Sequence, residues 1–161
     1  ALRLGPKLDT GLLGTRLMTT RYRVVASPAW VERHGRPKVP VDVAAMGVAT
    51  FPLPGFRDHW RFRDASGAVE TVAVHPGLLV SNGLGLLQAA VDGLGPTLLA
   101  DWLTADDRAA GRLVDLFPQH EATATDFDTA VWLLYASRQY LPLKVRAFID
   151  FAKGWFAANE A

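Results

Sequence analysis

Short extended runs and short amphipathic runs alternate along the chain. Two stretches near the start, 12–17 and 21–26, are expected to be extended. Further on, 59–64 and 70–76 alternate between apolar and polar positions well enough to predict a β-hairpin that turns at Ser66–Gly67. Because these strands alternate with helical segments, the pattern predicts an α/β fold.

Two helices have clear start and stop signals. Ser27 predicts an N-cap and Pro28 a first helical position, where the missing N–H of proline does no harm, and Gly35 supplies the stop. A second helix is expected over Leu84–Asp92, closed by Gly93. These signals place both helices independently of the apolar pattern.

The middle of the chain holds weaker signals. Thr104 with Asp107 has the T-x-x-D form of a capping box, which predicts a helix that begins there and ends at Gly111. A short helix is expected at 41–46, and a buried, strand-like run at 95–103.

The last quarter of the chain has the strongest apolar pattern. The segment 130–136 is apolar at every position, which is typical of a strand covered on both faces in an α/β fold. The next helix carries apolar residues at the spacing of one amphipathic face, which we expect to pack in the core rather than to bind a ligand. That face consists of Val145, Phe148, Ile149, Ala152, Trp155 and Phe156.

The composition fits one domain or two small lobes. Of 161 residues, 50% are apolar and 20% charged, and 17 basic against 16 acidic residues predict no strong grip on nucleic-acid phosphates. The absence of cysteine excludes disulfides and thiolate metal sites. No apolar run approaches the ~20 residues of a membrane span, and 1–11 lacks a signal peptide, so a cytoplasmic protein is expected.

Residues that could carry catalysis are scattered. No histidine has the spacing of a metal site, and no serine lies in a nucleophile elbow. Gly83 and Gly85 begin a G-x-G, but Gln88 takes the place of the third glycine of a dinucleotide fingerprint. Asp106 and Asp107 are interpreted as acids at a helix N-terminus. We therefore expect no metal, no cofactor and no enzyme.

One stretch, 80–95, has the features of a binding site. Ser81 and Asn82 are small polar residues at the junction of a strand and a helix, and Gly83 leaves backbone N–H groups uncovered there. Unpaired N–H donors and the positive end of a helix dipole favour a carboxylate. The alternative, that Ser81 and Asn82 only cap the helix, is favoured by the spacing alone.

Four segments carry a longer pattern: ALRLGPKLDTGLLGTRL (1–17), RYRVVASPAWVERHGRPKVPVDV (21–43), LLVSNGLGLLQAAVDGLGPTLLADWLTADDRAAGRLVDLFP (78–118) and RQYLPLKVRAFIDF (138–151). In this order they resemble the C-terminal effector-binding domain of LysR-type bacterial transcriptional regulators. The resemblance covers nearly the whole chain. The chain departs from the family's usual residues at Pro96, Ala100, Tyr140 and Leu143.

The resemblance implies a two-lobed fold like that of periplasmic binding proteins. Lobe I would comprise 1–26 plus 137–161, and lobe II 27–136. The first strand and helix of lobe I, and the family's N-terminal winged helix-turn-helix, are expected to be missing. A fragment of this kind would expose apolar surface and a strand edge, and would self-associate.

The resemblance also implies a function. A small, acidic organic effector would bind between the lobes, and the chain would form a homodimer or higher homo-oligomer. DNA would be contacted only through the absent N-terminal domain, and no membrane is involved. The expected effector-binding residues are Ser81, Asn82, Gly83, Arg3, Leu4 and Thr97.

Two alternatives remain at this level. A two-lobed solute-binding protein of a transport system would share the fold, although the missing signal peptide counts against it. A small enzyme on an α/β scaffold is the weakest alternative, because no catalytic constellation is present.

Overall fold

The structure, a computed structural model, describes residues 1–6, 13–135 and 142–159. Its contacts divide the chain into two compact units. Unit 1 combines Ala1–Thr20 with Asp128–Ala161, and unit 2 is Arg21–Phe127. The chain therefore passes between the units twice.

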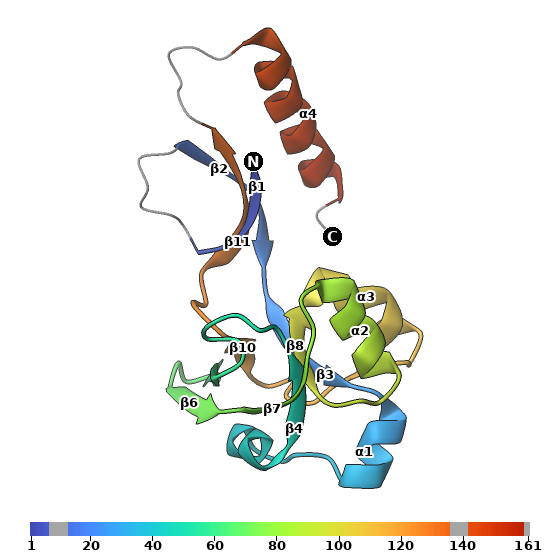
Figure 1. Ribbon diagram of the computed structural model, residues 1–161. Coiled ribbons are helices and arrows are strands. Elements are labelled where there is room, and N and C mark those ends of the chain that lie inside the picture. The colour runs from blue at the N-terminus through green and yellow to red at the C-terminus, as the bar shows by residue number, and fades with distance from the viewer. Residues whose placement is uncertain (7–12, 136–141, 160–161) are drawn as a thin grey trace. The chain divides into compact units, whose positions relative to one another are not determined.

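Unit 1 is an antiparallel sheet with a helix packed on it. Its elements are β1 (Leu2–Gly5), β2 (Leu13–Thr20), β11 (Thr129–Tyr135) and α4 (Leu143–Asn159). β11 lies in the middle, between β1 and β2 (Figure 1). In this register Leu2 pairs with Leu133, and Thr20 pairs with Thr129.

Among the described residues, unit 1 has a small buried apolar cluster. Its buried members are Leu17, Leu133, Ile149 and Ala152. The predicted apolar face of α4 divides around this cluster. Val145 and Phe156 pack against it, whereas Phe148 and Trp155 are 50% and 52% exposed. The expectation that the whole face is core is therefore correct for only part of it.

Unit 2 contains a six-stranded antiparallel sheet and a separate pair of parallel strands. The strands are β3 (Tyr22–Ala26), β4 (Gly47–Thr50), β5 (His59–Arg63), β6 (Val69–Ala73), β7 (His75–Leu79), β8 (Thr97–Ala100), β9 (Val114–Asp115) and β10 (Glu121–Thr123). The large sheet has the order β6–β5–β10–β3–β8, with β9 also paired to β3. β4 and β7 form the parallel pair.

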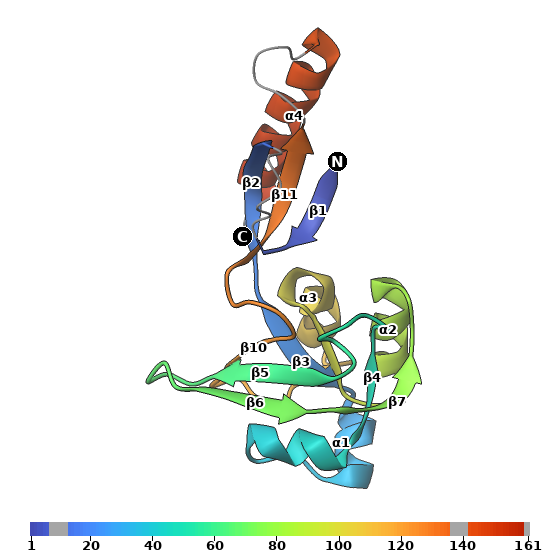
Figure 2. The ribbon, with the colours of Figure 1, turned by 60° about the vertical axis from the view of Figure 1, so that its left-hand side comes forward.

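The helices of unit 2 are α1 (Pro28–His34), the 3₁₀ helix η1 (Pro40–Ala45), α2 (Gly83–Val91) and α3 (Asp101–Ala109). α2 lies beside α3 (Figure 2). It also packs against β4 and β8. In the described part of the chain, no helix is long and apolar enough to cross a membrane.

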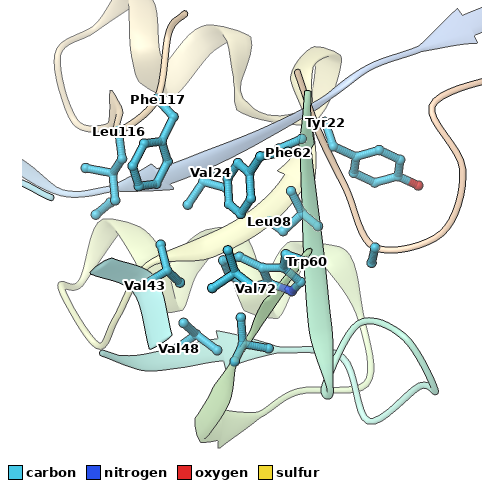
Figure 3. Close-up of a cluster of buried hydrophobic side chains, with 14 of the residues drawn as sticks. Tyr22, Val24, Val43, Val48, Trp60, Phe62, Val72, Leu98, Leu116 and Phe117 are labelled. Carbon is cyan, nitrogen blue, oxygen red and sulfur yellow. The ribbon is translucent and has the colours of Figure 1, made fainter. Parts of the chain in front are cut away.

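Alternation along the strands builds the main core of unit 2. The β5 sequence HWRFR turns Trp60 and Phe62 inward, both fully buried, and leaves two arginines on the opposite face. Figure 3 shows both rings among aliphatic side chains such as Val24 and Leu98. The Trp60 indole N–H donates to the Phe56 carbonyl at 2.8 Å, so the buried polar atom is satisfied.

Several local predictions are confirmed in unit 2. The Ser27 hydroxyl accepts the N–H of Trp30 at 3.2 Å, Pro28 begins α1, and Gly35 follows its end with a φ of 81°. The β5–β6 hairpin forms as expected. The short helix expected at 41–46 is the 3₁₀ helix η1.

The predicted start of α3 was wrong. The helix begins at Asp101, immediately after β8, so the strand-like run at 95–103 is a strand only over Thr97–Ala100. Thr104 lies inside the helix and is fully buried, and its hydroxyl donates to the Asp101 carbonyl at 3.1 Å. Its hydroxyl therefore bonds back to a carbonyl of the preceding turn instead of capping a helix.

The elements give the mixed α/β architecture that the pattern predicts. The predicted lobe limits, Ala26–Ser27 and Ala136–Ser137, fall later in the chain than the junctions between the two units. The difference arises because β3 joins the large sheet of unit 2 and β11 joins the sheet of unit 1, and an apolar run alone does not show which sheet it joins. The limit at Ala136–Ser137 and the departure at Tyr140 lie outside the described residues.

Candidate functional site

Two parallel strands of unit 2 end side by side, and α2 begins directly after one of them. β4 ends at Thr50 and β7 at Leu79, and the Val80 N–H donates to the Thr50 carbonyl at 3.0 Å. Parallel strands present their carboxyl ends at the same edge, so the segments that follow both strands meet there. Ligands of open α/β sheets bind beyond such strand ends.

Asn82 caps α2 and leaves two donors open. Its backbone is extended, with φ −138° and ψ 151°, and its Oδ1 accepts the N–H of Gly85 at 2.7 Å. Its carbonyl accepts the N–H of Leu86 at 3.2 Å. Among the described residues, the backbone N–H groups of Gly83 and Leu84 have no acceptor. These two donors at the positive end of the helix dipole form the polar part of the candidate site.

The first turn of α2 is closely packed at both of its glycines. A Cβ at Gly85 would lie 2.8 Å from Cγ1 of Val80 and 3.2 Å from Oδ1 of Asn82, so the cap would have to shift. A Cβ at Gly83 would lie 3.2 Å from Cδ2 of Leu103. The G-x-G of the sequence therefore serves close packing at the start of this helix.

Apolar side chains lie close to Gly83. Phe51, which follows β4, and Leu103 of α3 are the nearest side chains to the Cβ position of Gly83. Leu84 is 71% exposed, and Trp102 in the first turn of α3 is 47% exposed. The first turn of α2 contains no acidic residue. Free N–H donors, apolar neighbours and no carboxylate on the same turn suit the anion of a partly apolar organic acid.

Ser81 and Thr97 differ in accessibility. Ser81 is exposed, and no hydrogen bond occupies its side chain in the described part of the chain. Thr97 begins β8 as predicted, pairs with Val25 and is fully buried. Its Oγ1 has no hydrogen-bond partner among the described residues. Ser81 can therefore reach a ligand at the surface, whereas a ligand contact of Thr97 stays a prediction.

Arg3 and Leu4 belong to β1 of unit 1. They pair with Trp132 and Val131 respectively, and neighbouring residues of a strand point to opposite faces of the sheet. The buried Nη1 of Arg3 has no hydrogen-bond partner in the described part of the chain. Leu4 is 41% exposed. Both effector contacts stay predictions.

Two of the histidines have structural partners. His34 stacks on Trp30 with ring centroids 4.6 Å apart, and its Nδ1 is hydrogen-bonded to the Trp30 carbonyl. The Nδ1 of His75 lies 2.8 Å from the carbonyl oxygen of Ala44. No group of three or more His, Asp or Glu side chains among the described residues could hold a metal ion.

Sequence reasoning located the cap of the candidate site but missed its apolar neighbours. Ser81, Asn82 and Gly83 form one continuous segment with a recognisable helix-start pattern. Phe51 and Leu103 come from distant parts of the chain, and only the pairing of β4 with β7 and the packing of α2 on α3 bring them there. No local signal distinguishes them from other apolar residues.

The chain forms two α/β units and passes between them twice, as in two-lobed α/β binding domains. A family model described as the LysR substrate binding domain matches residues 1–157. The chain belongs to this family, and the resemblance and the fold class predicted from the sequence are confirmed.

Two curated relatives are transcriptional regulators. The chain is 32% identical over 151 residues to the HTH-type transcriptional regulator CrgA of Neisseria meningitidis serogroup C (strain 8013), covering 94% of this chain and 49% of the relative. It is 30% identical over 163 residues to the HTH-type transcriptional regulator DmlR of Escherichia coli (strain K12). This match covers 98% of this chain and 50% of the relative. The chain thus spans about half the length of the curated relatives it matches.

Solved structures agree on the fold. The regulatory domain of CrgA from Neisseria meningitidis, a LysR-type transcriptional regulator, has a TM-score of 0.76 at 26% identity, covering 96% of this chain and 74% of that one. The full-length virulence activator AphB of Vibrio cholerae has a TM-score of 0.77 at 23% identity, and the match covers 96% of this chain and 51% of that one. At its lower identity, the second match supports the fold alone.

Proposed function

We propose that this chain is the effector-sensing part of a LysR-type bacterial transcriptional regulator, and that a small organic acid binds at the N-terminus of α2. The proposal depends chiefly on one observation: among the described residues, the N–H groups of Gly83 and Leu84 have no acceptor. A carboxylate can accept from both, and the helix dipole favours its charge. The family and the regulators among the relatives support the sensing role.

In this proposal the chain is not an enzyme and uses no cofactor. An effector that binds one arrangement of the protein better than another shifts the equilibrium between them. The shift changes the geometry of a homodimer or higher homo-oligomer, and DNA is contacted only by a separate N-terminal winged helix-turn-helix domain. A regulator of this kind acts in the cytoplasm.

The position of the effector between the two lobes is a prediction from the sequence, and so are its contacts with Arg3, Leu4 and Thr97. Arg3 is the best supported of these three, because a guanidinium offers N–H donors that match a carboxylate and its buried Nη1 has no hydrogen-bond partner among the described residues. The alternative of a solute-binding protein of a transport system is less well supported, since the relatives are named as transcriptional regulators.

Variants at Asn82 test ligand binding separately from helix capping. Serine and aspartate both cap helices well, so Asn82→Ser keeps a neutral cap and Asn82→Asp keeps a cap with a negative charge beside the two free donors. We expect Asn82→Ser to bind an organic acid as the unmodified chain does, and Asn82→Asp to bind it at least about tenfold more weakly. Isothermal titration calorimetry with a panel of mono- and dicarboxylic acids measures both affinities.

The uncharged amide of each acid is the ligand control, and it should bind the Ser and Asp variants equally. Asn82→Ala is less informative, because loss of the cap alone costs about 1 kcal/mol of stability. Equal affinity of the Ser and Asp variants for the acid would remove the start of α2 from the effector site.

The regulatory part of the proposal has its own test in the reading frame upstream of Ala1. A winged helix-turn-helix encoded there supports the regulator. A signal peptide there would instead support the solute-binding protein and contradict control of DNA binding.

A further inference from the structure

The large sheet of unit 2 ends in an open strand. Among the described residues, β6 pairs with β5 alone, and no other strand lies on its outer side. At the other end of the sheet, β8 is buried at every residue, whereas four of the five residues of β6 are exposed. The outer edge of β6 is therefore accessible to another strand.

The pairing of β5 with β6 shows which backbone groups of β6 are free. Just beyond the strand, the N–H of Val74 donates to the carbonyl of Asp58 at 3.1 Å. Hydrogen-bonded positions recur at every second residue of an antiparallel pair, so Val72 and Glu70 also direct their N–H and C=O groups to β5. The backbone groups of the alternate residues point away from β5.

Three residues of β6 direct their N–H and C=O groups to the open side: Val69, Thr71 and Ala73. Among the described residues, these backbone groups have no hydrogen-bond partner. The 3₁₀ helix η1 approaches β6 from the core side, where Val43 and Val72 are both buried. The edge thus offers a row of alternating donors and acceptors that a further strand can satisfy.

β6 lacks the usual features that protect an edge strand. Protected edges carry lysine, proline or a β-bulge. The segment VETVA contains neither of these two residues, and its register with β5 is regular over the whole strand. Val69, Thr71 and Val72 are β-branched, which favours strand pairing. Its one charged residue is Glu70.

The segment is self-complementary about Thr71. When two copies lie antiparallel with their Thr71 residues opposite each other, Val69 of one copy lies opposite Ala73 of the other, and Glu70 lies opposite Val72. The outward backbone groups of both strands then pair, with about six hydrogen bonds in all. The neighbouring register that sets Glu70 opposite its own copy is disfavoured, because it brings two carboxylates together.

We propose that β6 is a contact surface between two copies of this chain, which pair their β6 strands antiparallel and join their large sheets into one. The partner is a second copy, because the register about Thr71 satisfies the open backbone groups of both edges and sets no carboxylate directly opposite another. The contact uses no residue of the candidate effector site, so it is independent of the proposed effector.

Substitutions of opposite charge at Thr71 test this pairing. The side chain of Thr71 is exposed, so Thr71→Lys and Thr71→Glu should both fold as the unmodified chain does. Each variant sets two like charges opposite each other, and we expect sedimentation velocity to show self-association at least about tenfold weaker. An equimolar mixture of the two variants should associate more strongly than either alone, since opposite charges then meet at this position.

Thr125→Lys is the matched control, because Thr125 is an exposed threonine of unit 2 outside β6 and the substitution adds the same charge. It should associate as the unmodified chain does. Equal thermal unfolding temperatures of Thr71→Lys and Thr125→Lys establish that the fold is retained.

A cross-link measures the register directly. The chain has no cysteine, so Thr71→Cys introduces a single thiol. Hydrogen-bonded antiparallel pairs have Cα atoms about 5.5 Å apart, within the range of a disulfide. Mild oxidation should therefore give a covalent dimer of Thr71→Cys and much less of Thr125→Cys.

Three results would overturn the proposal. The first is an unmodified chain that stays monomeric at about 100 μM. The second is equal association of Thr71→Lys and Thr125→Lys, and the third is a mixture of Thr71→Lys and Thr71→Glu that associates no better than either variant. None of these results bears on effector binding at α2, so the two proposals can fail separately.

Discussion

Tyr22 carries a phenol into the edge of the main core of unit 2. It is only 8% exposed, and its ring meets that of Phe56 edge to face at a centroid distance of 6.0 Å. Burial raises the pKa of Tyr22 to about 12, because the phenolate would lose its hydration. The folded protein therefore holds this proton at a pH where the unfolded chain, with a pKa of about 10, releases it.

A pH dependence of stability follows from this shift. Below about pH 10 Tyr22 is neutral in both the folded and the unfolded state, so it adds no pH dependence to the free energy of unfolding. Between about pH 10 and 12 the free energy of unfolding falls by roughly 2–3 kcal/mol, because only the unfolded chain releases the proton. In Tyr22→Phe, this part of the decrease in the free energy of unfolding should be absent. Urea unfolding of both proteins at about pH 9 and about pH 11.5 measures the difference. An equal decrease in the free energy of unfolding of both proteins between these two pH values would contradict the assignment of the pH dependence to Tyr22.

Asn82 shows that two interpretations of one residue can both hold. Its side chain caps α2 through Gly85, which is the structural interpretation that the spacing favours. The cap satisfies one donor of the first turn and leaves those of Gly83 and Leu84 without an acceptor in the described part of the chain. A ligand role for this junction therefore depends on backbone groups, and Asn82 positions them.

Among the elements, α4 departs most from its predicted burial. A single stripe through Val145, Ile149, Ala152 and Phe156 meets the sheet. Phe148, Phe151 and Trp155 are half to two-thirds exposed. A helix buries only the side that meets the sheet, so the apolar side chains of α4 that lie away from this stripe stay exposed among the described residues.

Substitutions on the two sides of α4 should have different costs. Ile149 is 6% exposed and Phe151 is 66% exposed. Ile149→Ala leaves a cavity in the small core and is expected to lower the free energy of unfolding by about 2–4 kcal/mol, whereas Phe151→Ala should change it by less than about 0.5 kcal/mol. Chemical denaturation of both variants measures this. A large loss in Phe151→Ala would show that its side chain is covered in solution.

At the scale of the whole molecule, the two units differ in how much core they have. The buried cluster of unit 1 joins one helix to two strands through Leu17 and Leu133. The main cluster of unit 2 draws on η1, α1 and most of the strands of that unit, with Trp60 and Phe62 at its centre. Burial of apolar surface is the main stabilising term, so unit 1 should be the less stable unit.

Hydrogen–deuterium exchange of the intact chain tests this difference. We expect amides of β11 to exchange at least about tenfold faster than those of β3 and β5, because unit 1 opens without unfolding unit 2. Measurement under conditions where opening and closing are fast relative to exchange gives the opening free energy of each unit. Equal protection of β11 and β5 would show instead that the two units unfold together.

Features whose causes lie within a few residues could be predicted from the sequence. Ser27, Pro28 and Gly35 set the ends of α1, and Ser81 or Asn82 was expected to begin α2, where the structure has Asn82 as the cap. Caps and left-handed glycines depend on local hydrogen bonds and dihedral angles, so a short segment is enough to predict them. The order of four longer segments also established the family.

Features that join distant segments could not be predicted in this way and became clear from the folded protein. Pairing placed β11 with β1 and β2, and packing placed Phe51 and Leu103 beside α2 and Phe127 on two arginines of β5. The turn from β8 into α3 likewise overrode a local capping motif at Thr104. These outcomes depend on which distant surfaces bury each other. A local apolar pattern predicts which residues favour burial, but it does not show which distant surface, if any, will cover each of them.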